Sequence, residues 1–234
     1  MPRAEPLDRW VPYVYYQPEI FRYLEVVALV GALPVGVEPH LLVTAADRAE
    51  ADAALPSDGD RPIVVVHPGA GNPRRRWPPE KFAAVGDALA SAGARVVVSG
   101  TPAEQYLVDA VISAMRWPAA DFRGRLSAGG LAGLLARAAV VVSNDSGPLH
   151  LASAVGAATV GIFWCGNLIN AGPLTRARHR PAISWRLACP VCGVDCTSGS
   201  CEHRASFVAD VPVAEVATSA LDMLAGWTCR NGRG

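Results

Sequence analysis

The segment at residues 62–72, Pro-Ile-Val-Val-Val-His-Pro-Gly-Ala-Gly-Asn, joins a continuous apolar run to a loop that contains two glycines. A short run that is apolar throughout is typical of a strand buried on both faces of a parallel sheet. A second run, at residues 140–143, leads into Asn144-Asp-Ser-Gly-Pro148 and from there directly into a helix. These segments predict a parallel sheet whose carboxyl edge carries unusual loops.

The same pattern extends over residues 61–234. Helices are expected between the strands, and their first turns carry proline or capping patterns such as Thr101-Pro-Ala-Glu104. The alternation predicts the α/β fold class, with a Rossmann-like doubly wound parallel sheet that has helices on both faces. The expected strands span residues 62–66, 95–99, 121–122, 140–143 and 158–163, and the expected helices begin at about 77, 101, 127, 150 and 212. Residues 164–205 are expected to be irregular and to include a cysteine-rich loop.

Residues 1–60 show a different pattern. Helices are predicted at residues 18–30 and from a capping box at Thr44-Ala-Ala-Asp47 to about residue 55. Pro56-Ser-Asp-Gly-Asp60 is rich in turn-forming residues and is expected to be a hinge. Because no strand is expected before this hinge, these helices have no sheet of their own to rest on, and we expect a domain boundary at residue 60.

The composition is that of a folded globular protein. Hydrophobic residues make up 51% of the 234 residues and charged residues 18%, which excludes a wholly disordered chain. The 21 basic and 21 acidic side chains cancel, so no basic excess favours a nucleic acid as partner. No apolar run reaches the length of a membrane span, and the first residues, Met-Pro-Arg-Ala-Glu-Pro, do not resemble a secretory signal. We therefore expect a cytoplasmic protein.

The loops after the first and fourth expected strands form the candidate ligand site. In a doubly wound sheet, ligands bind at the carboxyl edge where the strand order reverses, which lies between these two strands. The glycines of Gly69-Ala-Gly71 let backbone approach a ligand closely, and the arginines at 74–76 can donate to phosphate oxygens. Ser146-Gly precedes a helix whose free amide groups favour an anion, and His150 lies in its first turn. The two loops together predict a phosphate-binding site.

Each of these residues also has a structural interpretation. The glycines could form a tight turn, the arginines could be solvated, and His150 could be structural. Asp145 and Ser146 could be plain helix caps. The convergence of all these residues on one predicted edge favours the functional interpretation. The dinucleotide fingerprint, the Walker motif and the hydrolase nucleophile elbow are absent from the sequence.

Four segments occur in order between residues 61 and 226: His67-Pro-Gly-Ala-Gly, Arg75-Arg-Trp-Pro-Pro-Glu-Lys-Phe, Ser99-Gly-Thr-Pro-Ala-Glu and Ser143-Asn-Asp-Ser-Gly-Pro-Leu-His-Leu-Ala. In order and spacing they resemble glycosyltransferase family 9, the ADP-heptose:lipopolysaccharide heptosyltransferases. The resemblance implies a GT-B fold, in which two Rossmann-like domains face each other across a cleft. It identifies residues 61–234 with the C-terminal half of that fold, which binds the nucleotide-sugar donor.

The resemblance also implies roles for single residues. Arg75 stands where the family usually has a lysine that contacts the donor diphosphate. The exchange keeps the positive charge but replaces a compact ammonium group by a planar guanidinium group. Ser146 and Gly147 would lie at the phosphates, and Glu104 matches an acidic residue implicated in nucleotide binding. The complete expected donor-binding set is Gly69, Ala70, Gly71, Arg75, Glu104, Asp145, Ser146, Gly147 and His150.

Family members are typically about half again as long as this sequence. The resemblance therefore implies that most of the N-terminal acceptor domain is absent, with residues 1–60 as its remnant and hinge. The presumed catalytic base, an aspartate, would lie in the absent part, so no catalytic residue is assigned. A homodimer through residues 7–60 is also expected, because a monomer would expose Ile20, Leu24 and Val27.

The implied activity is inverting transfer from a nucleotide-diphospho-sugar to a lipopolysaccharide or another cell-surface glycan or glycolipid. The transfer needs no metal or other cofactor, and the acceptor would bring the protein into peripheral contact with a membrane. A truncated, non-catalytic nucleotide-sugar-binding module is one alternative, and a scaffold whose cysteine loop contacts a partner is another.

A cluster of four cysteines and one histidine lies within 15 residues, at 189–203. Cys189 and Cys192 have the Cys-x-x-Cys spacing that grips one metal ion, and Cys196 and Cys201 could complete a structural zinc site. Disulfides and free thiols remain alternatives. Similar cysteines occur in many family relatives, which implies a structural role for the loop.

Overall fold

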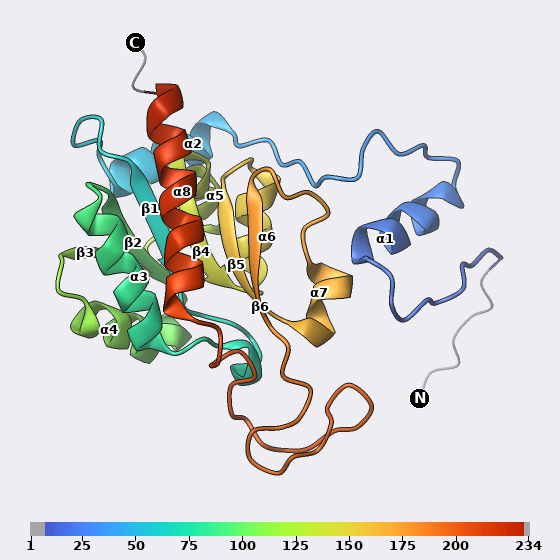
Figure 1. The fold of residues 1–234 in the computed structure, drawn as a ribbon. Helices are drawn as coiled ribbons and strands as arrows, with labels where there is room; N and C mark the ends of the chain where they lie inside the picture. The colour runs from blue at the N-terminus through green and yellow to red at the C-terminus, as the bar shows by residue number, and fades with distance from the viewer. Residues whose placement is uncertain (1–7, 232–234) are drawn as a thin grey trace.

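A computed structural model describes residues 8–231, which surround a six-stranded parallel sheet (Figure 1). The strand order is β3-β2-β1-β4-β5-β6, and every neighbouring pair is parallel. The doubly wound sheet with neighbouring first and fourth strands is therefore confirmed. The strands are β1 (Ile63–His67), β2 (Arg95–Gly100), β3 (Ala119–Arg123), β4 (Ala138–Asn144), β5 (Thr159–Trp164) and β6 (His179–Ser184). The N-terminal residues 1–7, on which the expected absence of a secretory signal rests, lie outside the described residues, as do residues 232–234.

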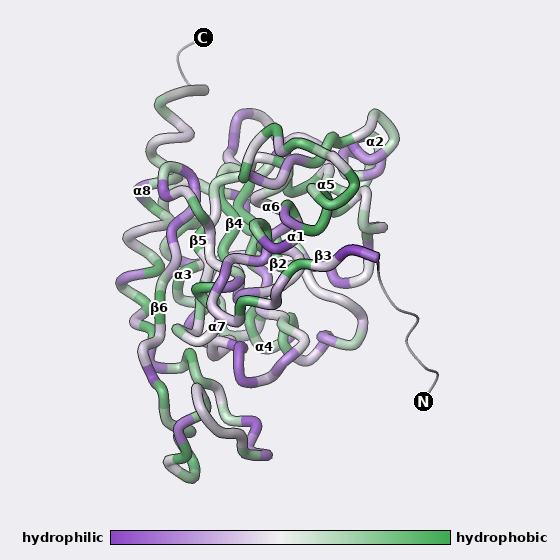
Figure 2. The backbone as a smooth tube through the Cα atoms, turned by 90° about the vertical axis from the view of Figure 1, so that its right-hand side faces the viewer, coloured by the Kyte–Doolittle hydropathy of each residue, from purple (hydrophilic) through white to green (hydrophobic). Residues whose placement is uncertain are grey.

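Helices cover both faces of the sheet, as the apolar strands require. Alternate residues of β1 enter two separate cores: Val64 and Val66 pack with α3, α4 and α8, whereas Val65 packs with α2, α5 and α6. Figure 2 shows the hydrophobic stretch of β4 at the centre of the molecule. The helices are α1 (Glu19–Ala28), α2 (Ala45–Ala54), α3 (Pro79–Ser91), α4 (Gln105–Ala114), α5 (Ala128–Arg137), α6 (Gly147–Ala154), α7 (Cys165–Ala171) and α8 (Val213–Asn231), with short 3-10 turns η1 (Pro73–Arg75) and η2 (Pro102–Glu104).

Helix α2 corrects one expectation. The predicted capping box at its start is confirmed, but its residue Ala51 and the following Leu55 are buried in the core beneath the sheet. Glu50 also accepts hydrogen bonds of 2.6 Å from the backbone amide and the hydroxyl of Ser127, which begins α5. The idea that helices before residue 60 have no sheet to rest on is therefore wrong for α2, because the packed core extends back to this helix.

Helix α1, in contrast, lies beside α7 at the end of an extended segment (Figure 1). Asn170 of α7 donates to the backbone oxygen of Tyr15, and a cavity of about 490 Å³ lies between α1 and the β5–β6 side of the sheet. Val27 is exposed, and Ile20 and Leu24 are half-buried. The expected homodimer through this region stays a prediction.

The segment at 164–205 is more ordered than the sequence analysis predicts, because it contains α7 and β6. The sequence indicates both elements only weakly, since α7 has just seven residues and β6 contains Pro181. A proline suits the edge of a sheet, and β6 is an edge strand because it pairs with β5 alone. Among residues 8–231, no helix combines the length and the apolar character needed to cross a bilayer.

Candidate functional site

The loops that follow β1 and β4 are joined by the side chain of Asn144. This residue ends β4, is fully buried, and accepts a hydrogen bond of 2.9 Å from the backbone amide of Trp77. Its amide group donates to the backbone oxygen of Pro68 at 2.8 Å. Because one buried amide bonds to both ends of the β1 loop, the expected juxtaposition of the two loops is confirmed.

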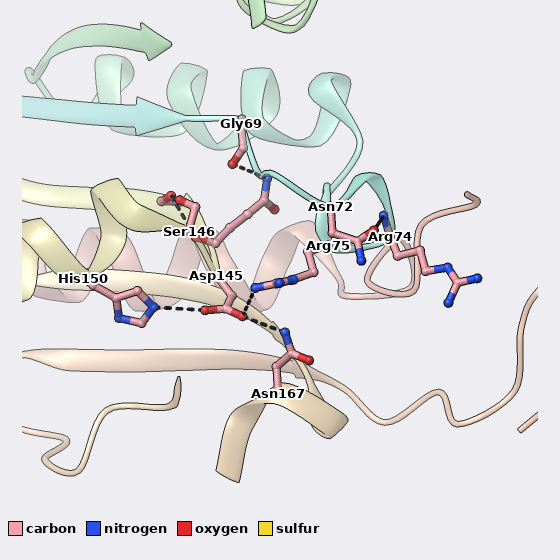
Figure 3. A network of polar contacts seen from close by, with 10 residues as sticks. Gly69, Asn72, Arg74, Arg75, Asp145, Ser146, His150 and Asn167 are labelled. Carbon is pink, nitrogen blue, oxygen red and sulfur yellow. Dashed lines mark hydrogen bonds and ion pairs between the residues drawn. The ribbon is translucent and has the colours of Figure 1, made fainter. Parts of the chain in front are cut away.

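The carboxylate of Asp145 is the centre of the site (Figure 3). It is 2% exposed and accepts hydrogen bonds from Arg75 Nη1 at 3.1 Å and from Asn167 Nδ2 at 2.9 Å. His150 Nε2 lies 3.1 Å from its other oxygen. An ionised carboxylate only accepts hydrogen bonds, so His150 Nε2 is the donor here. Four side chains from three separate loops and helices thus meet at one buried charge.

This network keeps Asp145 ionised. Burial raises the pKa of its carboxyl, but the hydrogen bonds from His150 and Asn167 and the charges of His150 and Arg75 outweigh that effect. The pKa of Asp145 therefore lies below its ordinary value. The charge of the carboxylate in turn fixes the orientation of the guanidinium and the imidazole.

Arg75 and His150 also border the solvent, since their side chains are 39% and 49% exposed. Beside them begins α6, whose N-cap residue is Ser146. The Ser146 hydroxyl makes no capping bond but lies 3.0 Å from the hydroxyl of Ser143. The interpretation of Asp145 and Ser146 as plain helix caps is therefore wrong for their side chains. An anion at this edge would meet a cation, an imidazole and the amino end of a helix.

The glycine loop, to which Asn144 bonds, lies beside Glu104. A Cβ atom on Gly69 would clash with the Glu104 carboxylate, whereas Gly71 faces open space. Glu104 also accepts two hydrogen bonds from Thr101, so it completes the predicted capping box of η2. Glu104 therefore contacts the glycine loop and also has a local structural role.

The three consecutive arginines point in different directions. Arg75 alone reaches Asp145, whereas Arg76 Nε donates to the backbone oxygen of Ala70 at 2.9 Å. Arg74 turns toward the cysteine-rich loop, where its Nε donates to the backbone oxygen of His203 at 2.7 Å. One arginine is thus left for a ligand, and the other two fix the loop that carries it.

Two asparagines of the site were missed in the sequence. Asn144 could have been found as a polar residue at the end of an apolar strand. Asn167 had no usable signal, since it lies on the unpredicted helix α7.

The cysteine cluster lies close to this site and differs from the expected ligand set in one residue. The ligand atoms of Cys189, Cys192, Cys201 and His203 all lie within 4.8 Å of one another, which is close enough to share one metal ion. Cys196 is outside this group, although its Sγ lies 3.9 Å from that of Cys201. The four cysteines form no disulfide. Hydrogen bonds from the amides of Cys192 and Val191 contribute to lowering the pKa of the Cys189 thiol to about 6.

His67, at the end of β1, predicts a pH dependence of stability. Its buried Nδ1 lies 3.1 Å from the Ser99 hydroxyl. Burial lowers the pKa of the imidazole below its ordinary value of 6.5, although the charge of Glu104 acts in the opposite direction. The unfolded chain therefore takes up a proton at a higher pH than the folded chain does. The free energy of unfolding should fall as the pH drops below 6.5 and stop falling once the folded pKa is passed.

Denaturant unfolding over roughly pH 7.5 to 5 measures this dependence, since histidine titrates in that range. His67→Asn should have a flatter profile than the wild-type protein. The half-buried His179 also has a lowered pKa, but it titrates in both proteins and cancels in their difference. Identical slopes would contradict the role given to His67.

The fold and the site define the chain as a Rossmann-like α/β protein with a candidate anion site at the edge between β1 and β4. The model of glycosyltransferase family 9 (heptosyltransferase) matches residues 7–184, and the chain belongs to this family. The resemblance found in the sequence is therefore confirmed.

Individual relatives are more distant. The chain is 28% identical over 169 residues to lipooligosaccharide heptosyltransferase 2 of Haemophilus influenzae, a match that covers 68% of this chain and 46% of that protein. A family 9 glycosyltransferase of Veillonella parvula has a similar structure, with a TM-score of 0.72 at 22% identity over 95% of this chain and 63% of that one. ADP-heptose lipopolysaccharide heptosyltransferase II of Escherichia coli gives a TM-score of 0.65 at 20% identity, over 83% and 56% of the two chains.

The structural matches show that the chain has the α/β fold of heptosyltransferase structures. The chain spans about half the length of the curated relative that it matches.

Proposed function

We propose that this chain is the sugar-donor half of a GT-B heptosyltransferase and binds a nucleotide-diphospho-sugar of the ADP-heptose type. The observation that carries the proposal is the buried Asp145 carboxylate, which holds Arg75 and His150 toward the open edge beside the start of α6. The relatives support the choice of ligand, since one is named an ADP-heptose heptosyltransferase. The proposed acceptor is a lipopolysaccharide or another cell-surface glycan.

The proposed chemistry is electrostatic. Sugar transfer breaks the bond to the diphosphate, which gains negative charge as it leaves. Arg75 and the amide groups at Ser146 and Gly147 would stabilise that charge, and they are held in place before the reaction begins. Stabilisation of this kind needs no metal ion. Donor-contact roles are proposed for Gly69, Ala70, Gly71, Arg75, Glu104, Asp145, Ser146, Gly147 and His150.

Inverting transfer also requires a base within reach of the attacking hydroxyl. We assign this role to no side chain in the described part of the chain and propose that it belongs to the acceptor half of a GT-B heptosyltransferase. A second candidate is a module that binds the sugar donor without transfer, because no base is assigned among the described residues.

Calorimetric titration with ADP tests the binding site. The wild-type chain should bind ADP saturably. His150→Ala should weaken binding about tenfold, because one hydrogen bond from the imidazole to a charged phosphate of ADP would be lost. His40, which is exposed and lies outside the site, provides the matched control His40→Ala. Equal affinities of wild type and His150→Ala would contradict the site.

Nucleotide release separates the two candidates. ADP-heptose is incubated with the chain, with and without a lipooligosaccharide acceptor. Release that depends on the acceptor would support the transferase, whereas binding without release would support the module.

A further inference from the structure

The loop at residues 189–203 begins with a tight turn that places two thiols together. The Cys189 amide donates to the backbone oxygen of Val194 at 2.8 Å, and the Gly193 amide donates to that of Cys189 at 2.9 Å. Gly193 has φ +74°, a left-handed conformation that glycine adopts without strain. A bridge between Ala188 and Asp195 closes the base of the turn. The backbone hydrogen bonds of this turn therefore hold Cys189 and Cys192 close together.

The next ten residues return the chain to this turn. Cys201 and His203 come within 4.8 Å of both thiols, measured between ligand atoms. In a tetrahedral site with metal–sulfur bonds near 2.3 Å, neighbouring sulfur atoms are about 3.8 Å apart. To close around one ion, the ligand atoms would therefore need to move by about 1 Å or less.

We propose that Cys189, Cys192, Cys201 and His203 bind one tetrahedral, thiolate-favouring divalent ion, with zinc as the best fit, and that this ion fixes the neighbouring loop that carries Arg75. Three thiolates and one imidazole form a common ligand set of structural zinc. A disulfide would join two of the thiols and leave the third and His203 without a role. The set also explains why a histidine, and not Cys196, faces the other three ligands.

Arg74 connects the cluster to the phosphate-binding edge. Its guanidinium donates to the Cys201 Sγ at 3.2 Å and to the Cys201 backbone oxygen, and its Nε donates to that of His203. The backbone oxygen of Arg74 in turn accepts a hydrogen bond of 2.8 Å from Phe207. Arg74 and Arg75 are adjacent in the single turn of η1, so any loosening of one moves the other. A cavity of about 120 Å³, lined by both arginines, Asn167, Cys196 and Phe207 among others, separates the loop from the site.

Arg74 is thus a positioning residue with two tasks. Toward the metal, it donates to a ligand sulfur and orients it; partners of this kind typically change metal affinity 10- to 100-fold. Toward the sugar donor, it holds the turn from which Arg75 extends. The metal site is independent of the proposed function. The effect of the ion on the loop that carries Arg75 rests on that function.

Metal analysis of the protein, purified under reducing conditions without added chelator, tests the ligand set. Zinc and iron are measured together, and one equivalent of either ion per chain is expected. His203→Ala, which changes an exposed side chain, and Cys192→Ser should both lose the ion, whereas the control Cys196→Ser should keep it. Cobalt added to the stripped protein should give thiolate-to-metal absorption that is lost in the same two variants. A wild-type protein with far less than one equivalent, or a Cys196→Ser variant that loses as much metal as Cys192→Ser, would overturn the site.

The coupling is tested by titrating metal-loaded and stripped protein with ADP. Stripping should weaken ADP binding roughly tenfold, because misplacement of a charged contact by about 1 Å is costly. In Arg74→Ala the affinity should be low from the start and should no longer depend on the metal, while the free energy of unfolding, measured with denaturant, should stay close to that of the wild-type protein. Equal affinities of loaded and stripped wild-type protein would overturn the coupling. If loaded wild-type protein bound no ADP at all, the proposed function would fail while the metal content still decided the ligand set.

Discussion

Arg75→Ala is expected to weaken ADP binding by about 10- to 100-fold, the range that a lost hydrogen bond to a charged group covers. Two effects act in the same direction. The diphosphate would lose the cationic partner that we propose for it, and the buried Asp145 carboxylate loses the positive charge that faces it at 3.1 Å. His150 and Asn167 still bond to Asp145, so the carboxylate stays ionised and would repel the phosphates. Calorimetric titration with ADP measures the change.

Two further variants make this experiment specific. Arg61→Ala removes an arginine from the opposite edge of the sheet, just before β1, where it pairs with Asp58 at 3.6 Å. It alters the net charge equally and should leave ADP affinity unchanged. Arg75→Lys restores the charge without the planar fork and should recover part of the loss. An unchanged affinity in Arg75→Ala would remove this residue from the site.

The sheet and the edge of the site could be predicted because their signals are local. Continuous apolar runs at β1 and β4 require cover on both faces, and the known order of such sheets makes these strands neighbours. The loops that follow them, with Asp145 and Arg75, then meet at one edge without further assumptions. Helix α2 could not be placed in this way, since nothing in its own residues shows that Ala51 packs beneath the sheet.

The remaining parts of the site depend on contacts between distant residues. Asn167 reaches Asp145 from 22 positions further along the chain, on a helix of seven residues without caps of its own. Arg74 bonds to residues 127 and 129 positions away, so the sequence could not show that its side chain points away from that of Arg75. In the cysteine loop, spacing favoured Cys196, but the return of the chain brings His203 to the cluster.

Trp77→Ala is expected to lower the free energy of unfolding by about 3–5 kcal/mol, as is usual for a buried aromatic residue replaced by alanine. The indole is fully buried, packs edge-on against Phe82 with ring centres 5.0 Å apart, and donates to the backbone oxygen of Val211 at 3.1 Å. That oxygen keeps a second donor, Lys81 Nζ at 3.0 Å, so the cost arises from the cavity and not from an unsatisfied carbonyl. Denaturant unfolding measures the change.

Trp185→Ala is the matched control, because this tryptophan is 69% exposed and its loss should change stability by about 0.5 kcal/mol or less. Equal effects of the two replacements would contradict the packing assigned to Trp77.

ADP affinity supplies an independent check. Trp77 is tied to the site by its backbone amide, which bonds to Asn144 and is retained in alanine. The folded fraction of Trp77→Ala should therefore bind ADP with an affinity much closer to that of the wild-type protein than Arg75→Ala does. Arg75→Ala should show the reverse pattern, with affinity lost and stability largely kept, since its side chain is 39% exposed. These opposite outcomes separate the residue that supports the loop from the residue that the loop presents to the ligand.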